Sequence, residues 1–236
     1  MLTGMKRFLF SVLILSLTGT LTFAAGPKVH TVGLGSGKRV PYSIAGDPAG
    51  ARAEEKELRI RPLIVDGKAK EWTTGDAHDV TDRSFAVRRA IRLNDALPTE
   101  RTEHWVWQRG PWLLIDRTTG KVTALHLPDY DPAVSEVVWF RDYAAYCGLT
   151  SSGKQLYAVV SQVAARKPVL ARKLGVWDVG DHPTPACAPA AWQREPLRIG
   201  FQPTDGQAVS FDLVGSSAVL VEEGDTADGG GSDSPN

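Results

Sequence analysis

The chain has 236 residues, with 27 basic and 27 acidic side chains, so its formal net charge is zero. A neutral chain has no strong field to attract nucleic acid or an anionic membrane surface, and neither is expected as a partner. Hydrophobic residues make up 42% of the chain, which is enough to fill one core or two smaller ones.

Residues 1–24 have the pattern of a secretory signal peptide. Lys6 and Arg7 form a basic start, the run 8–17 is almost wholly apolar, and small residues lead up to Ala24. We expect cleavage after Ala24 or Ala25 and export to the periplasm or the extracellular space. The alternative is a retained anchor, because the uncharged run to Ala25 approaches the length of a membrane span. No later stretch is apolar enough to span a membrane, so the cleaved chain is expected to be soluble.

Residues 25–104 are expected to form an N-terminal β region with polar loops. The run G-L-G-S-G-K at 33–38 is similar to a phosphate-binding loop, but Arg39 stands where that motif needs Ser or Thr. We therefore interpret the run as a turn before a strand at 39–44. The stretch 82–97 fits either a strand or a short helix, and we prefer the strand.

The densest polar cluster lies at 73–83, after an expected strand at 62–66. Carboxylates and an imidazole at this spacing can bind a divalent cation, and an Asp–His pair can prepare an imidazole for general-base chemistry. The alternative is a solvated loop in which Asp side chains cap turns. The candidate metal ligands are Asp76, His78, Asp79 and Asp82.

Three segments of the C-terminal half share one pattern. Each begins with Trp-x-Arg, continues as an apolar run, reaches a polar turn with Gly120, Gly153 or Gly206, and then resumes with a second apolar run. This is the pattern of a β-hairpin. Because it occurs three times, packing explains it better than catalysis, and the alternative is a ring of Trp–Arg pairs around a shared pocket. The candidate binding residues are Trp107, Arg109, Trp139, Arg141, Trp192 and Arg194.

The unit W-x-R…D-x-x-T-G-K-V-x-x-L, from Trp107 to Leu125, resembles the strand–turn–strand unit of TolB-type and WD-repeat β-propeller blades. V-V-W-F-R-D-Y-A-A-Y-C-G, at 137–148, resembles an inner strand of such a blade. The resemblance covers residues 105–222 and implies that the hairpins are blades. At about 40 residues a blade, the chain has room for roughly five at most. We expect a mainly β fold of repeated hairpins at 105–221, small or partial and propeller-like, with a β-sandwich or barrel as the alternative.

The two cysteines, Cys147 and Cys187, both follow the predicted signal peptide. An oxidising compartment permits a disulfide between them. Two free thiols are the alternative, because spacing alone does not bring the two Cα atoms within reach. Residues 222–236 are rich in Gly, Asp and Ser with nothing to bury, and predict a disordered acidic tail.

These features favour an exported, soluble β-repeat protein that binds or scaffolds in the cell envelope or outside the cell, without catalysis. Its partner is expected to be another envelope or extracellular protein or a carbohydrate, because Trp and Arg are prominent at contact surfaces. No cofactor is expected, apart from a possible divalent cation at the Asp–His cluster.

Two alternatives stay open. One is a metal-assisted hydrolase that uses the Asp–His cluster, so the sequence leaves open whether the chain is an enzyme and names no catalytic residue. The other is a structural partner in a larger assembly, which predicts an exposed apolar patch.

Overall fold

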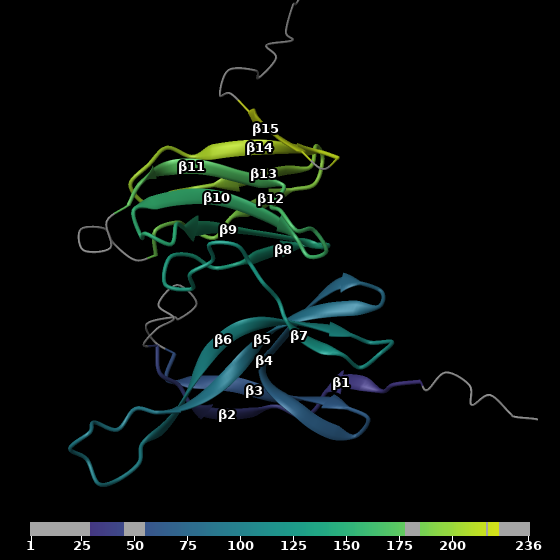
Figure 1. Ribbon diagram of the computed structural model, residues 1–236, viewed down its shortest axis with the longest axis vertical. Coiled ribbons are helices and arrows are strands. Elements are labelled where there is room, and N and C mark those ends of the chain that lie inside the picture. The colour runs from purple at the N-terminus through teal and green to yellow at the C-terminus, as the bar shows by residue number, and fades with distance from the viewer. Residues whose placement is uncertain (1–28, 45–54, 178–184, 216, 222–236) are drawn as a thin grey trace, which may run out of the picture.

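The computed structural model describes residues 29–44, 55–177, 185–215 and 217–221. In these ranges the chain is mainly β, with three antiparallel sheets and no helix (Figure 1). The predicted β class is confirmed. The described strands form no closed barrel or propeller, so the propeller-like arrangement is unconfirmed. The predicted signal peptide and acidic tail lie outside the described residues.

Across the ranges just given, the chain contains no helix that is long and apolar enough to cross a membrane.

The N-terminal unit is a seven-stranded antiparallel sheet in the order β1-β3-β4-β5-β6-β7, with β2 also paired to β3. Successive side chains of a strand point to opposite faces, so Leu58 and Ile60 enter one apolar cluster and Leu63 enters another. The sheet therefore has a small core on each face. Its strands are β1 (Val32–Leu34), β2 (Lys38–Pro41), β3 (Glu57–Val65), β4 (Lys68–Thr81), β5 (Ser84–Asn94), β6 (Trp105–Asp116) and β7 (Val122–Ala124).

This first sheet curls until the end of β2 reaches β6. Tyr42, which follows β2, forms a parallel bridge with Trp107, and the Ser43 backbone N–H donates to the Trp107 carbonyl at 3.0 Å. Val40 and Ala90 are buried inside the curl with Leu58 and Ile60 of β3. The curled sheet does not close completely, and its open end, which we call the mouth, lies beside Trp107.

The turn between β3 and β4 shows why the strands reverse where they do. Asp66 and Gly67 are its two central residues, and both have positive φ, 52° and 74°. Two such residues form the tight turn whose twist matches that of the flanking strands. The strand predicted at 62–66 and the one preferred at 82–97 are thus present, as β3 and β5.

The C-terminal unit consists of two four-stranded antiparallel sheets that face each other (Figure 1). Their inner faces share one core, to which Leu156 and Val160 contribute from one sheet and Phe201 and Phe211 from the other. This is the two-layer packing of a β-sandwich. The strands are β8 (Val138–Phe140), β9 (Tyr143–Leu149), β10 (Gln155–Gln162), β11 (Leu170–Val176), β12 (Ala191–Gln193), β13 (Arg198–Phe201), β14 (Val209–Val214) and β15 (Ser217–Val221).

All three predicted hairpins are present, as β6–β7, β9–β10 and β13–β14. The second and third units share a local structure in which Trp139 or Trp192 lies on a short edge strand that precedes the hairpin. The first differs, because Trp107 lies within the long strand β6. The first sheet continues through β7 and so crosses the predicted boundary at 104/105.

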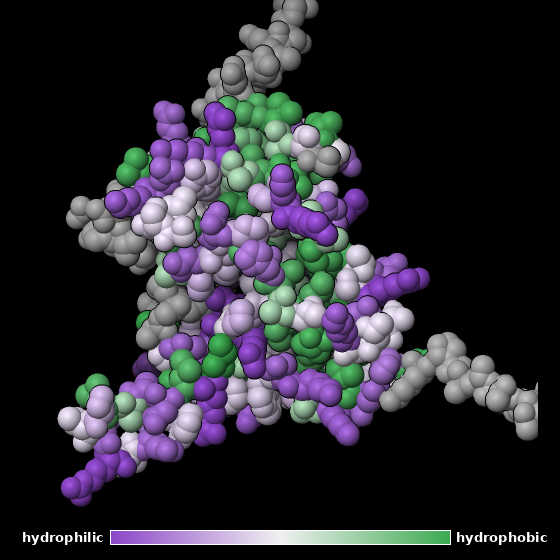
Figure 2. All heavy atoms as spheres, viewed as in Figure 1, coloured by the Kyte–Doolittle hydropathy of each residue, from purple (hydrophilic) through white to green (hydrophobic). Residues whose placement is uncertain are grey.

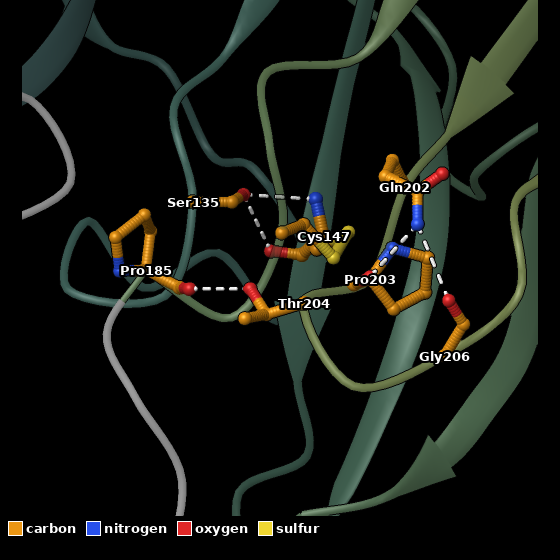
Figure 3. Close-up of a disulfide and its surroundings, with 8 residues drawn as sticks. Ser135, Cys147, Pro185, Gln202, Pro203, Thr204 and Gly206 are labelled. Carbon is orange, nitrogen blue, oxygen red and sulfur yellow. Dashed lines mark hydrogen bonds between the residues drawn. A yellow bond between two sulfur atoms is a disulfide. The ribbon is translucent and has the colours of Figure 1, made fainter.

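The predicted disulfide is confirmed. Cys147 of β9 bonds to Cys187, which pairs with Pro203 after β13, so the bond ties the two sheets together (Figure 3). Both cysteines are 1% exposed. The buried Ser135 hydroxyl donates to the Cys147 carbonyl and accepts from its N–H, each at 2.8 Å. Thr204 donates to the Pro185 carbonyl beside them.

Removing this disulfide should strongly destabilise the sandwich. The bond closes a loop across a sequence separation of 40 residues, and chain entropy alone gives a loss of about 4 kcal/mol in the Cys147→Ala/Cys187→Ala variant. Urea unfolding of the parent protein and the variant, with and without reductant, measures this loss of unfolding free energy. Reductant should destabilise only the parent protein, and an equal response in the variant would contradict the prediction.

A second stability prediction concerns the pair Arg198–Asp212, whose residues lie opposite each other on β13 and β14. The guanidinium donates to both carboxylate oxygens, at 2.7 and 3.2 Å, and this lowers the pKa of Asp212 and raises that of Arg198. A lowered carboxyl pKa stabilises the fold above the ordinary value of 3.8, and this stabilisation is lost as pH falls through the folded pKa.

Asp212→Asn should therefore lower the thermal midpoint at pH 6, and the difference from the parent protein should shrink as the pH is lowered below about 3.8. Thermal unfolding followed by circular dichroism from pH 2.5 to pH 6 provides the measurement. If the difference in thermal midpoint grows as the pH is lowered, the ionised Arg198–Asp212 pair does not stabilise the fold.

Candidate functional site

A concavity lies at the open end of the curled N-terminal sheet. It has a volume of about 550 Å³, and strands β2, β4, β5 and β6 supply its walls. We call it the tryptophan groove. Its principal residues are Lys38, Lys70, Trp72, Arg89, Arg92 and Trp107.

Two indoles form the centre of the tryptophan groove. Trp72 lies opposite Pro62 of β3, and Trp107 lies opposite Arg92 of β5, so the sheet registers bring both rings to the inner side of the curl. The ring centroids are 5.8 Å apart with an interplanar angle of 72°, an edge-to-face contact. The Lys38 ammonium lies 4.6 Å from the centre of the Trp72 ring and 6.0 Å from that of Trp107.

The aromatic surface continues outward along β6. Trp105 shares a face with Trp107 because side chains repeat every second residue in a strand. The Arg92 guanidinium lies 4.6 Å from the centre of the Trp105 ring. Trp105 is 40% exposed and begins β6, where the loop between β5 and β6 ends; this loop extends from the body in Figure 1. Indoles and cations therefore alternate along one strip.

The tryptophan groove is positively charged. Lys38, Lys70, Arg89 and Arg92 line it, and among its described lining residues Glu71 is the one carboxylate. Glu71 accepts from Arg89 Nε at 2.9 Å, which balances one of the four cations. The three other cations are exposed to solvent.

Arg109 belongs with Trp107 to the first Trp-x-Arg unit and follows it on the same face of β6, beside the strip of indoles and cations. Its guanidinium donates to Glu55 at 2.7 Å and to the Tyr42 hydroxyl, and it lies over the Tyr42 ring. Its ion pair with Glu55 is largely withdrawn from solvent. Arg109 thus holds the segment after β2 against β6.

The second unit, Trp139 and Arg141, lies elsewhere and joins the two parts of the molecule. The Trp139 ring stacks on His78 of β4 with centroids 5.3 Å apart, and meets Trp112 of β6 edge to face at 5.2 Å. His78 Nε2 donates to the Arg141 carbonyl at 2.6 Å. Trp139 is therefore part of the contact between the first sheet and the sandwich.

The third unit lies at a side of the sandwich. Trp192 donates from Nε1 to the Val138 carbonyl at 3.2 Å and packs near the Phe140 ring, while Arg194 is exposed in the turn that follows β12. The three Trp-x-Arg units therefore lie in three different places and do not surround a shared pocket.

The Asp–His cluster is not gathered into a site. Asp76, His78 and Asp79 lie on β4, so the segment is mostly strand and not the loop considered from sequence, and Asp82 lies in the following turn. His78 stacks on Trp139, and the Asp79 carboxylate pairs with Arg117 at 2.6 Å. In the part of the chain that the structure describes, no three His, Cys, Asp or Glu residues group as metal ligands.

Known proteins give no guide to the function of this chain. A scan against protein-family models and searches of curated proteins and of solved structures found no match.

Sequence reasoning identified Trp107 but missed Lys38, Trp72 and Arg92. These residues come from three different strands, and only the pairing of β2 through β6 brings them to one mouth. The run K-A-K-E-W at 68–72, in which a tryptophan follows two lysines and a glutamate, was the available signal.

Exposed apolar side chains lie at the outer end of the sandwich, where the structural-partner alternative predicts a patch. Figure 2 shows hydrophobic residues there, around β14 and β15. The exposed ones are Val214, Val219 and Leu220. Val219 lies opposite Asp212 and Leu220 opposite Phe211, so these two point to different faces of the edge strand β15.

The packing of His78 predicts its behaviour on mutation. His78→Ala removes the ring stack on Trp139 and the hydrogen bond to Arg141, and should lower the free energy of unfolding by about 1–2 kcal/mol. Asp79→Ala removes an exposed ion pair and should cost less than about 1 kcal/mol. Urea unfolding measures both.

Metal analysis of the purified protein is the control. We expect that the protein holds no stoichiometric divalent cation at His78 and Asp79, so neither substitution should change its metal content. A bound metal lost in both variants, with equal losses of stability, would establish a metal site instead.

Proposed function

We propose that the protein is an exported, non-catalytic binding protein of the cell envelope or extracellular space, and that the tryptophan groove holds its ligand. The observation that carries the proposal is the groove itself, a concavity of about 550 Å³ with two indoles and four cations. Ligand sites are typically concave, of this volume, and lined by aromatic side chains with a few polar groups.

The composition of the groove supports contact with a partner. Trp and Arg contribute most to binding energy at interfaces, because they bury large surfaces and also form polar contacts. Trp72 and Trp107 are half-buried, so their remaining surface faces the groove on a rigid sheet. A surface that is already ordered loses little conformational entropy on binding.

Export is supported by two independent features. The N-terminal sequence has the order of basic, apolar and small residues typical of a signal peptide. The second feature is the Cys147–Cys187 bond, because disulfides form and persist in oxidising compartments.

The absence of catalysis is proposed from the chemistry of the groove. Glycoside hydrolysis generally uses two carboxylates across the scissile bond, whereas the described lining supplies only Glu71, which is paired with Arg89. The rival metal-assisted hydrolase would need Asp76, His78 and Asp79 to converge, and His78 and Asp79 each have other partners.

The test is binding of the mature protein to an array of purified polysaccharides and extracellular proteins. Trp72→Ala should weaken the response at least tenfold, since a buried aromatic anchor is worth about 2 kcal/mol or more. Trp192→Ala is the matched control, because it also loses a half-buried indole but lies outside the groove. Equal weakening in both variants, or no response from the parent protein, would contradict the proposal.

A further inference from the structure

We propose that the ligand of the tryptophan groove is an acidic polysaccharide, a chain of sugar rings that carry carboxylate groups. The inference rests on the proposed binding function and adds the chemical class of the ligand. It is carried by the charge of the groove and by the aromatic strip.

The charge of the groove selects an anion. Of its four lining cations, Arg89 is balanced by Glu71, while Lys38, Lys70 and Arg92 give the groove an excess of positive charge. The whole chain is neutral by count, so this excess is local. A concave surface of one sign raises the local concentration of oppositely charged ligands.

The arrangement of the cations suits carboxylates that recur along a chain. The Lys38 ammonium lies over the Trp72–Trp107 pair, and the Arg92 guanidinium lies over Trp105. Each cation is therefore held beside an indole. An acidic sugar ring that lies against one of these cation–indole pairs brings its carboxylate within reach of the cation, and guanidinium pairs with carboxylate through two parallel hydrogen bonds.

The indoles supply surfaces for the rings themselves. Trp105 and Trp107 are two residues apart on one face of β6, about 7 Å along the strand, and Trp72 extends the strip across the sheet. A pyranose ring has a face of C–H groups that packs on an indole and a rim of polar groups that remains hydrated. Cations lie over these rings, so a ligand meets indole surface and positive charge in alternation, which fits an extended chain of sugars better than a compact ligand.

An acidic peptide is the alternative occupant of this surface. Extended peptides commonly bind by adding a strand to a free sheet edge. At the groove, residues 69–72 of β4 pair with β3 and residues 90–92 of β5 pair with β6, while the pairing between β4 and β5 ends at Thr73 and Arg89, so both strands have an unpaired edge there. The row of indoles and cations favours the polysaccharide, and the comparison of poly-L-glutamate with polygalacturonate distinguishes the two ligand classes.

The test is calorimetric titration of the mature protein with three probes. Polygalacturonate is the acidic polysaccharide, its fully methyl-esterified form has the same backbone without charge, and poly-L-glutamate carries carboxylates on a peptide. Polygalacturonate should bind at least tenfold more tightly than either of the other probes. Its affinity should fall as sodium chloride is raised from 50 to 500 mM, because exposed charges are screened.

Matched variants locate the binding. Lys38→Ala/Arg92→Gln should weaken polygalacturonate binding at least tenfold, since removing a charge-assisted hydrogen bond weakens affinity roughly tenfold or more. Lys173→Ala/Arg172→Gln makes the same charge change on β11, where both side chains are exposed, and should leave binding unchanged. Equal weakening in the two double variants would overturn the assignment to the groove.

The failures of the two proposals are distinguishable. If the esterified chain or poly-L-glutamate binds as tightly as polygalacturonate, and Trp72→Ala abolishes that binding, the groove is a binding site but the acidic-polysaccharide class is wrong. If Trp72→Ala leaves all binding unchanged, or no probe and no member of the array binds, both the ligand class and the proposed groove function are overturned.

Discussion

In a fold that lacks helices over its described length, a sheet can cover its apolar face only with another sheet or with itself. This constraint organises both parts of the molecule. The two four-stranded sheets cover each other and share one core. The seven-stranded sheet curls instead, so that Val40 of β2 and Ala90 of β5 enter one cluster inside the curl. Incomplete closure of that curl leaves the tryptophan groove at its mouth.

The contact between the two parts is aromatic. Trp139 of β8 meets Trp112 of β6 and His78 of β4, while Tyr146 and Val159 extend the same cluster into the sandwich. The indole N–H groups of Trp112 and Trp139 are buried without a hydrogen-bond partner among the described residues. Leaving such a group unsatisfied costs about 1–3 kcal/mol, so aromatic packing has to offset that cost here.

The groove and this contact use the same residue type for different purposes. Trp107 keeps part of its ring at the surface, on a curled sheet beside cations. Trp139 is covered by a second unit of the protein. Both lie in a Trp-x-Arg unit, so the local motif does not distinguish a ligand surface from a packing surface. What distinguishes them is which element lies opposite the ring.

The hairpins show how much local sequence determined. Apolar alternation and a Gly-containing turn depend only on neighbouring residues, so the strand pairs around Gly120, Gly153 and Gly206 were predictable. The position of the cysteines after the signal pattern made a disulfide permissible, although it could not show that Cys147 and Cys187 meet.

Sheet assignment and site were decided by tertiary structure. The same hairpin can stand in a propeller blade or a sandwich, because the choice depends on which other strands cover its apolar face. Lys38, Trp72 and Arg92 share the groove with Trp107 through pairings between strands distant in sequence. Likewise, the sequence made His78 a candidate metal ligand, whereas in the structure its ring packs against Trp139. A turn and an alternating pattern fix the register of a hairpin, but which distant strands become neighbours depends on which apolar faces the whole fold covers.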